Sequence, residues 1–214
     1  MAAAIAALTR NSAAALLIAV DAGHFHDKPG VIAASGATEL EHNLALAAEL
    51  RQELEREGFA ARMIGQHARL GARTREAQGA ALFVSIHHDS VQQRFLPEAR
   101  LFSGFSLFVS RRNRELDASR RCASAIGSHL RTIGLAPSRY HADPVFGEKR
   151  PFADAVNGVH YFDNLAVAHT ASMPAVLIEA GVVVNPEDER RVTGPAMRQA
   201  IAAAITRGIR ECMR

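Results

Sequence analysis

The sequence is poor in aromatic side chains and has no block of one charge. Its 214 residues contain no tryptophan, and Phe, Trp and Tyr together account for 6% of them. Proteins that bind unpaired bases commonly stack them on aromatic rings, so any such affinity must come from other groups here. Arginine is interspersed with glutamate, and the formal net charge is only +3, so we expect no nucleic-acid partner.

Cysteine is scarce, and long apolar runs are absent. Cys122 and Cys212 are spaced neither as a zinc knuckle nor as a C-x-x-C redox pair, and we expect both to be buried or inert thiols. Residues 1–10 are small and apolar but lack the basic stretch with which a secretory signal begins, so no clear signal peptide is visible. The apolar run over residues 13–20 is too short to cross a bilayer, so we expect no membrane span.

Hydrophobic residues, in contrast, make up 48% of the chain, which predicts one sizeable core and a single domain over residues 1–214. Three apolar runs of strand length each lead into a side chain that can bind a metal or carry a proton. The runs cover residues 16–20, 81–86 and 175–178, and they lead into His24, His87 and Glu179. If these runs are neighbours in a parallel sheet, their carboxyl ends meet at the edge where α/β sheets bind ligands. The pattern therefore predicts a metal site or an acid/base site.

A fourth candidate lies at the start of a predicted helix. Thr38 and Glu41 match a capping box, in which the Glu side chain returns to the N-cap backbone. Glu39 lies in the same first turn but not at the box position, so its carboxylate is free to point toward the strand ends. The alternative is that Glu39 only complements the helix dipole.

The remaining pattern alternates strands with helices, which favours an α/β fold. We expect strands over residues 59–64 and 104–109, and helices over residues 38–58, 70–79 and 113–133 and from Pro186 and Pro195 onward. Residues 134–164 show no clear period, and a loop of that length is usually either a functional cover or a misread element. We expect residues 135–164 to pack over or beside the site.

Five motifs occur in a fixed order along the chain. They are Asp-Ala-Gly-His at 21–24, Glu39 four residues before Asn43, Leu-x-x-Arg at 70–73, Ser-Ile-His at 85–87, and Pro-Ala-Val-Leu-Ile-Glu at 174–179 followed by Asn185. In this order they resemble the zinc-dependent N-acetylmuramoyl-L-alanine amidases of the amidase type 3 family, over nearly the whole chain.

The resemblance implies a single α/β domain with a mostly parallel sheet of about six strands flanked by helices on both faces. It implies one zinc ion per chain, bound by His24, Glu39 and His87, with Glu179 as the catalytic residue. The implied substrate is peptidoglycan, cut between N-acetylmuramic acid and L-alanine, and the implied location is periplasmic or extracellular. No regulatory partner protein can be identified from the sequence.

The motifs also depart from the family pattern. His26 stands where the family has glycine, His88 and Asp89 follow the Ser-Ile-His motif, and Val182 replaces a phenylalanine. Because successive strand residues point to opposite faces, His88 cannot easily share a metal with His87, and we interpret His26 and His88 as surface groups or as neighbours of the ligands. Of the other histidines, we expect His42, His67, His129 and His141 to be exposed, and His160 and His169 to lie near the cover.

Two imidazoles, one carboxylate and an open fourth position suit a catalytic zinc, which lowers the pKa of water from about 15.7 toward 7. Glu179, at the end of an apolar strand, could take the proton of that water and pass it to the departing amine, and desolvation would favour its protonated form in the second step. The alternative is that Glu179 only orients a ligating histidine.

Two other functions stay open at this point. The first is a zinc carboxypeptidase-like peptidase, for which Arg73 or Arg150 could bind a terminal carboxylate. The second is a non-catalytic peptidoglycan-binding module on the same fold. Without the family resemblance, the residues indicate only a hydrolase that cleaves an amide bond with the help of a metal ion.

Overall fold

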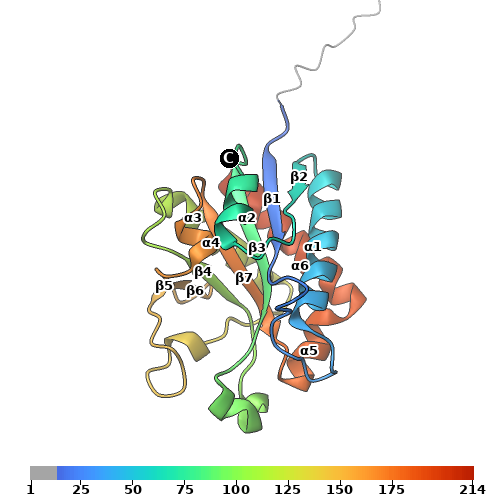
Figure 1. Ribbon diagram of the computed structural model, residues 1–214, viewed down its shortest axis with the longest axis vertical. Helices are drawn as coiled ribbons and strands as arrows, with labels where there is room; N and C mark the ends of the chain where they lie inside the picture. The colour runs from blue at the N-terminus through green and yellow to red at the C-terminus, as the bar shows by residue number, and fades with distance from the viewer. Residues whose placement is uncertain (1–13) are drawn as a thin grey trace, which may run out of the picture.

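The computed structural model describes residues 14–214, which form a seven-stranded sheet between two layers of helices (Figure 1). The strand order is β2-β1-β3-β7-β4-β6-β5. The strands are β1 (Leu17–Ala22), β2 (Ala60–Met63), β3 (Leu82–Asp89), β4 (Ser106–Val109), β5 (Phe152–Asp154), β6 (Val159–Tyr161) and β7 (Ala175–Val182). The expected α/β class and the flanking helices are confirmed, with seven strands in place of about six.

The three apolar runs are adjacent strands. β1 pairs with β3 and β3 with β7, both in parallel, so that their carboxyl ends lie at one edge of the sheet as predicted. β2 extends the parallel part beside β1, whereas β4 is antiparallel to β7 and β5 is antiparallel to β6. β5 and β6 lie in the segment for which the sequence showed no clear period. They were not predicted because strands of three residues are too short to show an alternation. That segment was therefore in part a misread element.

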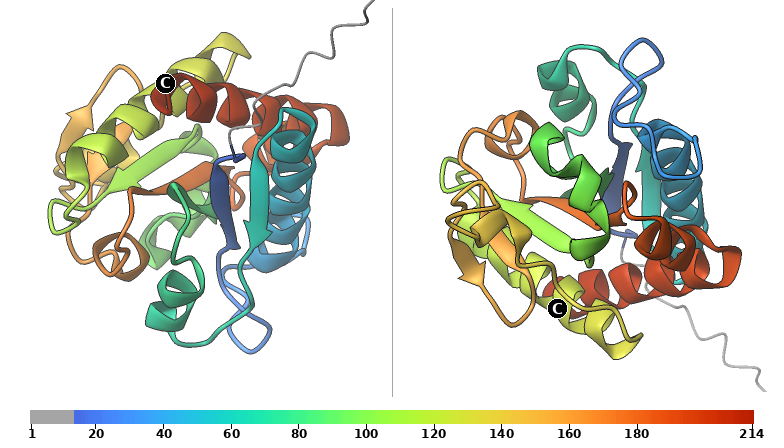
Figure 2. Two further views of the ribbon diagram at one scale, coloured as in Figure 1. Left: turned by 90° about the horizontal axis from the view of Figure 1, so that it is seen from above. Right: turned by 90° about the horizontal axis from the view of Figure 1, so that it is seen from below.

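The helices cover the two faces of the sheet unequally (Figure 2). α1, α3 and α6 lie on one face, and the short helices α2 and α4 lie on the other. Their bounds are α1 (Glu39–Arg56), α2 (Leu70–Glu76), α3 (Leu116–Thr132), α4 (Ala166–His169), α5 (Pro186–Thr193) and α6 (Pro195–Cys212), and there are two 3-10 segments, η1 (Gln93–Leu101) and η2 (Tyr140–Ala142). The face under α2 and α4 is consequently covered by a thinner layer of helices.

Side chains alternate between the two faces along each strand, and this alternation decides which of them point to the face under α2 and α4. Val20, Ile86 and Ile178 belong to the core shared with the three long helices. The residues that alternate with them, among them Asp21, His87 and Glu179, therefore point to the opposite face. The sequence thus builds a large apolar core on one side of the sheet and reserves the other side, near the strand ends, for polar groups.

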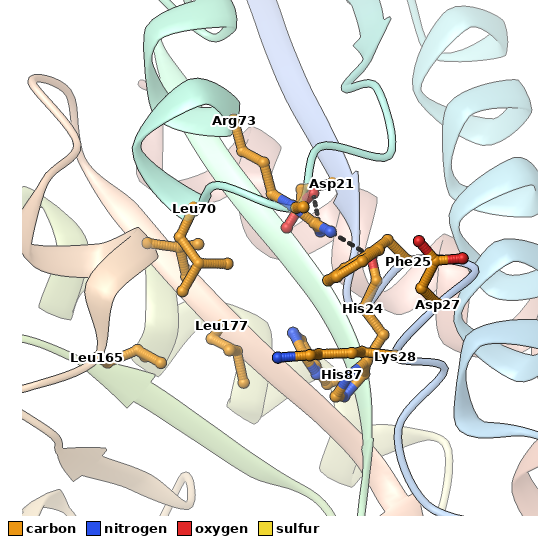
Figure 3. A pocket seen from close by; sticks show the side chains of 12 residues that line it. Asp21, His24, Phe25, Asp27, Lys28, Leu70, Arg73, His87, Leu165 and Leu177 are labelled. Atoms are coloured by element: carbon orange, nitrogen blue, oxygen red, sulfur yellow. Dashed lines mark hydrogen bonds and ion pairs between the residues drawn. The ribbon is translucent and has the colours of Figure 1, made fainter.

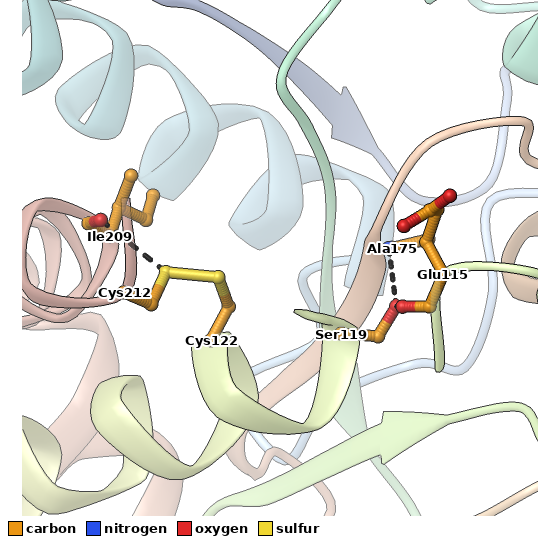
Figure 4. The surroundings of a disulfide bond; sticks show 6 residues. All are labelled: Glu115, Ser119, Cys122, Ala175, Ile209 and Cys212. Carbon is orange, nitrogen blue, oxygen red and sulfur yellow. Dashed lines mark hydrogen bonds between the residues drawn. A yellow bond between two sulfur atoms is a disulfide. The ribbon is translucent and has the colours of Figure 1, made fainter. Parts of the chain in front are cut away.

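The two cysteines are not free thiols. Cys122 of α3 and Cys212 of α6 form a disulfide across the helical layer (Figure 4). The expectation of inert thiols was wrong, because 90 residues separate the two positions and only the packing of α3 against α6 brings them together. Disulfides form and persist in oxidising compartments, so this bond bears on where the protein works.

The expectations about residues 1–10 fall outside the described part of the chain. From residue 14 onward, none of the helices combines the length and the apolar character needed to traverse a membrane.

Candidate metal centre

His24, Glu39 and His87 converge in the structure. His24 follows β1, Glu39 opens α1 and His87 lies in β3. One donor atom from each lies within 4.8 Å of the other two. His24 Nε2 is 2.9 Å from Glu39 Oε2, and His87 Nδ1 is 3.0 Å from Glu39 Oε1. Two nitrogens and one carboxylate therefore face a common point.

The start of α1 explains why Glu39 is free to join them. Thr38 Oγ1 accepts the backbone N–H of Glu41 at 3.2 Å, and Glu41 Oε2 accepts that of Thr38 at 2.7 Å. The capping box is thus complete without Glu39, as predicted, and the Glu39 carboxylate lies against the histidines. Burial raises the pKa of Glu39, but His24 and His87 outweigh it and hold the carboxyl ionised.

Two glycines make room for these side chains. An added Cβ at Gly23 would lie 2.1 Å from His87 Nε2, and one at Gly30 would lie 2.4 Å from Glu39 Oε2. Gly30 also has a φ of +82°, which L side chains rarely adopt. The glycine of the Asp-Ala-Gly-His motif is therefore required by the close approach of the His87 ring.

A buried ion pair holds the end of β1 in place. Arg73 Nη1 contacts Asp21 Oδ1 at 2.8 Å, and the same guanidinium donates to the carbonyls of Ala22 and His24 (Figure 3). Ser85 Oγ donates to Asp21 Oδ2 at 2.6 Å. Arg73 is only 1% exposed and thus fixes the turn that carries His24, so it is not available to bind a terminal carboxylate.

Glu179 lies on the strand next to His87. The two residues are direct partners across β3 and β7, so their side chains share one face of the sheet. Glu179 Oε2 is buried and has no hydrogen-bond partner among residues 14–214. Burial raises the pKa of Glu179 well above its ordinary value, and the carboxylates of Asp89 and Glu39 raise it further.

Two hollows of different character border the cluster, and His24 and His87 line both. The apolar hollow, about 670 Å³, is walled chiefly by Phe25, Leu70, Leu165, Val167 and Leu177, and the charged residues Asp27 and Lys28 also line it (Figure 3). The polar hollow, about 340 Å³, is lined among others by Glu39, His88, Asp89, Tyr140, His141, Glu148, Arg150, Phe162 and Glu179. Five of these come from residues 135–164, so that segment lies beside the cluster.

The polar hollow contains a network that no motif indicated. His141 Nε2 lies 2.7 Å from Asp89 Oδ2, and His141 Nδ1 lies 2.8 Å from Glu148 Oε2. Burial lowers the pKa of His141, but the two carboxylates outweigh burial and raise it to about 9. The expectation that His141 is exposed was wrong, because its partners are 52 and seven residues away and only the fold joins them.

The other histidines differ in burial. His26 is fully exposed, whereas His88 is buried and its Nδ1 lies 2.8 Å from Asn43 Oδ1. Asn43 Nδ2 in turn donates to Glu39 Oε1 at 3.3 Å, so the His88 side chain reaches the cluster through Asn43, while the His88 backbone N–H donates to Glu39 Oε1 at 3.4 Å. His42 was expected to be exposed but is half-buried against Glu189.

The expectations for the remaining positions have mixed outcomes. His67 is exposed as expected, and His129 is half-buried. His160 is fully buried, but neither it nor His169 lines either hollow. Val182, in place of the phenylalanine, is buried against Val91 and Tyr140 beside the polar hollow.

A known protein family and individual known proteins match this chain over most of its length. Residues 18–211 match the Amidase_3 family model, described as N-acetylmuramoyl-L-alanine amidase. The chain is 26% identical to N-acetylmuramoyl-L-alanine amidase AmiA of Salmonella typhimurium, covering 94% of this chain and 77% of that protein. It is 27% identical to AmiC of Neisseria meningitidis, covering 90% of this chain and 51% of the other.

Solved structures show the same fold. The crystal structure of the amidase Ami1 of Mycobacterium smegmatis matches with a TM-score of 0.76 and 21% identity, covering 92% of this chain and 96% of that one. An N-acetylmuramoyl-L-alanine amidase of Clostridium difficile 630 matches with a TM-score of 0.75 and 19% identity, covering 93% and 97%.

Proposed function

The chain belongs to the N-acetylmuramoyl-L-alanine amidase family, type 3, and from this premise we propose that it uses zinc to hydrolyse the amide between N-acetylmuramic acid and L-alanine in peptidoglycan. The observation that carries the proposal is the convergence of His24, Glu39 and His87, with Glu179 beside them. Family membership makes the chain an amide hydrolase of the cell wall; the metal and the residue roles are the proposal.

The donor set fits zinc. Two imidazole nitrogens and one carboxylate oxygen within 4.8 Å are the ligands of a catalytic zinc that keeps one position open. Magnesium and calcium prefer shells of oxygen, which this cluster does not offer. Gly23 and Gly30 leave no room for a larger side chain against His87 and Glu39, which agrees with a closely built site. We therefore assign one zinc per chain to His24, Glu39 and His87.

When bound, zinc supplies a Lewis acid that lowers the pKa of water toward 7 and polarises the amide carbonyl. Glu179 accepts the proton of the attacking water and returns it to the nitrogen of L-alanine as the C–N bond breaks. Its raised pKa brings the carboxyl nearer to the pH at which it can do both. The orphaned oxygen, Oε2, is an acceptor left free for this task.

The structure also favours a location outside the cytoplasm. The Cys122–Cys212 disulfide is typical of proteins in oxidising compartments, and peptidoglycan itself lies outside the cytoplasmic membrane. We propose a periplasmic or extracellular site of action. The peptidase alternative loses Arg73, which is buried against Asp21, and keeps only Arg150 as a possible clamp, while the family match favours the amidase. The convergence of His24, Glu39 and His87 argues against the non-catalytic alternative.

The test is digestion of purified cell walls, with product analysis by mass spectrometry. The purified protein should release stem peptides that begin with a free L-alanine amine, and a chelator should stop the release until zinc is restored. Release of single amino acids from the peptide carboxyl end would support the peptidase instead. Binding to walls without release would support the non-catalytic module.

A further inference from the structure

Arg150 lies in the wall of the polar hollow with its flat face occupied and much of its edge free. Its guanidinium carbon is 3.5 Å from the centroid of the Phe162 ring. Its Nη2 is 2.7 Å from Glu148 Oε2, which is the one side-chain ion pair of Arg150 among residues 14–214. The five N–H donors of a guanidinium lie in its plane, so stacking on a ring leaves them available. One contact to Glu148 does not use them all.

Four carboxylates line the hollow. Glu179 makes no ion pair with Arg150 among residues 14–214, although the two charges lie close enough to influence each other. The other three pair with histidines. Glu39 faces His24 and His87, and Asp89 faces His141. Glu148 is shared, because its Oε2 contacts both His141 and Arg150. Among the described residues of the hollow, Arg150 is therefore the permanent cation with donors left for a ligand.

The backbone fixes Arg150 before any ligand arrives. Its own N–H donates to the carbonyl of His141 at 2.8 Å, which closes the turn that carries it. In this turn an added Cβ at Gly147 would lie 1.7 Å from the carbonyl oxygen of Tyr140, and Lys149 has a φ of +56°. A side chain held in place by packing and by its own backbone loses little freedom on binding.

We propose that Arg150 binds a carboxylate on the peptide side of the cleaved amide and so selects stem peptides whose residue after L-alanine carries a free carboxyl group. This inference rests on the proposed amidase function. In the substrate, the lactyl carboxyl of muramic acid is tied up in the cleaved amide, so the free carboxylates lie on the peptide. A guanidinium with two parallel donors is the group that recognises a carboxylate bidentately. The peptide would accordingly occupy the polar hollow.

The experiment compares two soluble muropeptides that differ in one group, the carboxyl of the residue after L-alanine, present either as the free acid or as the amide. The wild-type protein loaded with zinc should cleave the acid with a kcat/KM about 10–100-fold higher, as expected for a hydrogen bond to a charged group. Arg150→Gln should abolish this preference, mainly through KM for the acid, and leave the amide substrate nearly unchanged. Arg150→Lys should restore part of the preference, because the charge returns without the fork.

Arg111→Gln is the matched control. Arg111 also pairs with a carboxylate, Asp163, and lies over a ring, Tyr161 at 5.0 Å, but it lines neither hollow. This variant should keep the wild-type preference. An equal loss on both substrates in Arg150→Gln and Arg150→Lys, at unchanged zinc content and Tm, would overturn the inference and assign Arg150 to the packing or pKa of Glu179. A wild-type enzyme that cleaves both without preference would also overturn it, whereas one that cleaves neither would overturn the proposed function itself.

Discussion

The two hollows beside the candidate metal cluster share His24 and His87 but differ in the character of most of their other lining residues. The apolar hollow is walled by aliphatic side chains from α2, α4 and β7, such as Leu70 and Leu177. The polar hollow is lined by polar and charged groups from β3, β7 and residues 140–150, such as Asp89 and Arg150. One wall can bind by burying apolar surface, and the other can move protons and recognise charge.

This difference gives the site a direction. A peptidoglycan strand has its free carboxylates on the peptide, and both the cationic Arg150 and Glu179, the proposed proton carrier, lie at the polar hollow. The departing amine belongs to the peptide as well, so Glu179, the group that we propose to return a proton to it, is on the same side as the peptide. The apolar hollow, whose walls are mainly aliphatic although Lys28 also lines it, is left for the less charged muramyl side of the substrate.

The largest expected effect comes from removing a residue that both hollows share. His87→Ala should eliminate stoichiometric zinc binding and reduce activity to background, because it deletes one of the two nitrogen donors. Elemental analysis and wall digestion measure the two quantities.

His88→Ala is the matched control for that variant. His88 is the next residue, but its side chain reaches the cluster only through Asn43, and its backbone N–H, which donates to Glu39, is kept in the variant. Zinc should therefore remain near one per chain, while Tm falls because a buried hydrogen bond is lost. If His88→Ala lost zinc and His87→Ala kept it, the ligand assignment on β3 would be wrong by one residue.

The next effect separates the hollows, because Glu179 lines only the polar one. Glu179→Gln keeps size and hydrogen-bonding capacity but cannot accept a proton, so kcat should fall by roughly 100-fold or more while zinc content and Tm persist. If Glu179 only orients a ligand, zinc affinity should weaken by about 10–100-fold instead. Full activity at saturating zinc in this variant would remove Glu179 from the proton transfer.

Much of the fold was predictable because its signals are local. The apolar runs that became β1, β3 and β7, the capping box before α1 and the stripe of α3 each lie within one element. What failed depends on contacts between distant segments. β5 and β6 are too short to show a period, and the Cys122–Cys212 bond requires the packing of α3 on α6.

The residues of the candidate site were likewise predictable where their signals are local and were missed where they depend on distant contacts. His24, Glu39, His87 and Glu179 follow readable strand ends or a helix start, and the structure brings the first three within 4.8 Å. The polar network was missed because His141 lies in a segment without a period and meets Asp89 across 52 residues. A hint was available, since Asp89 departs from the family motif at the position that contacts His141.

The third expected effect is on stability and is confined to the polar hollow. The pKa of His141 is raised to about 9, above its ordinary value of about 6.5, so folding takes up a proton there. The resulting stabilisation is complete below about pH 6.5 and is lost as the pH rises through about 9. His141→Gln should therefore lower the free energy of unfolding by about 1–3 kcal/mol at pH 6 and by much less at pH 10.

Denaturant titrations at several pH values measure this difference. His67→Gln is the control, because its ring also faces one carboxylate, that of Glu76, but at the surface, where such a pair contributes about 0–1 kcal/mol. A loss in His141→Gln that stays constant from pH 6 to pH 10 would show that the ring contributes by packing and not by charge.

The smallest expected effect belongs to the apolar hollow, where only buried surface is at stake. Leu70 is 44% exposed and lines that hollow, so Leu70→Ala should raise KM by about 3- to 10-fold and leave kcat, zinc content and Tm nearly unchanged. Leu96→Ala is matched in chemistry and exposure, at 43%, but lines neither hollow and should behave as wild type. If the muramyl side of the substrate occupies this hollow, the KM change should persist when the carboxyl after L-alanine is amidated. A change seen only with the free acid would mean that the peptide, not the muramyl group, occupies the apolar hollow, and the direction assigned to the site would have to be reversed.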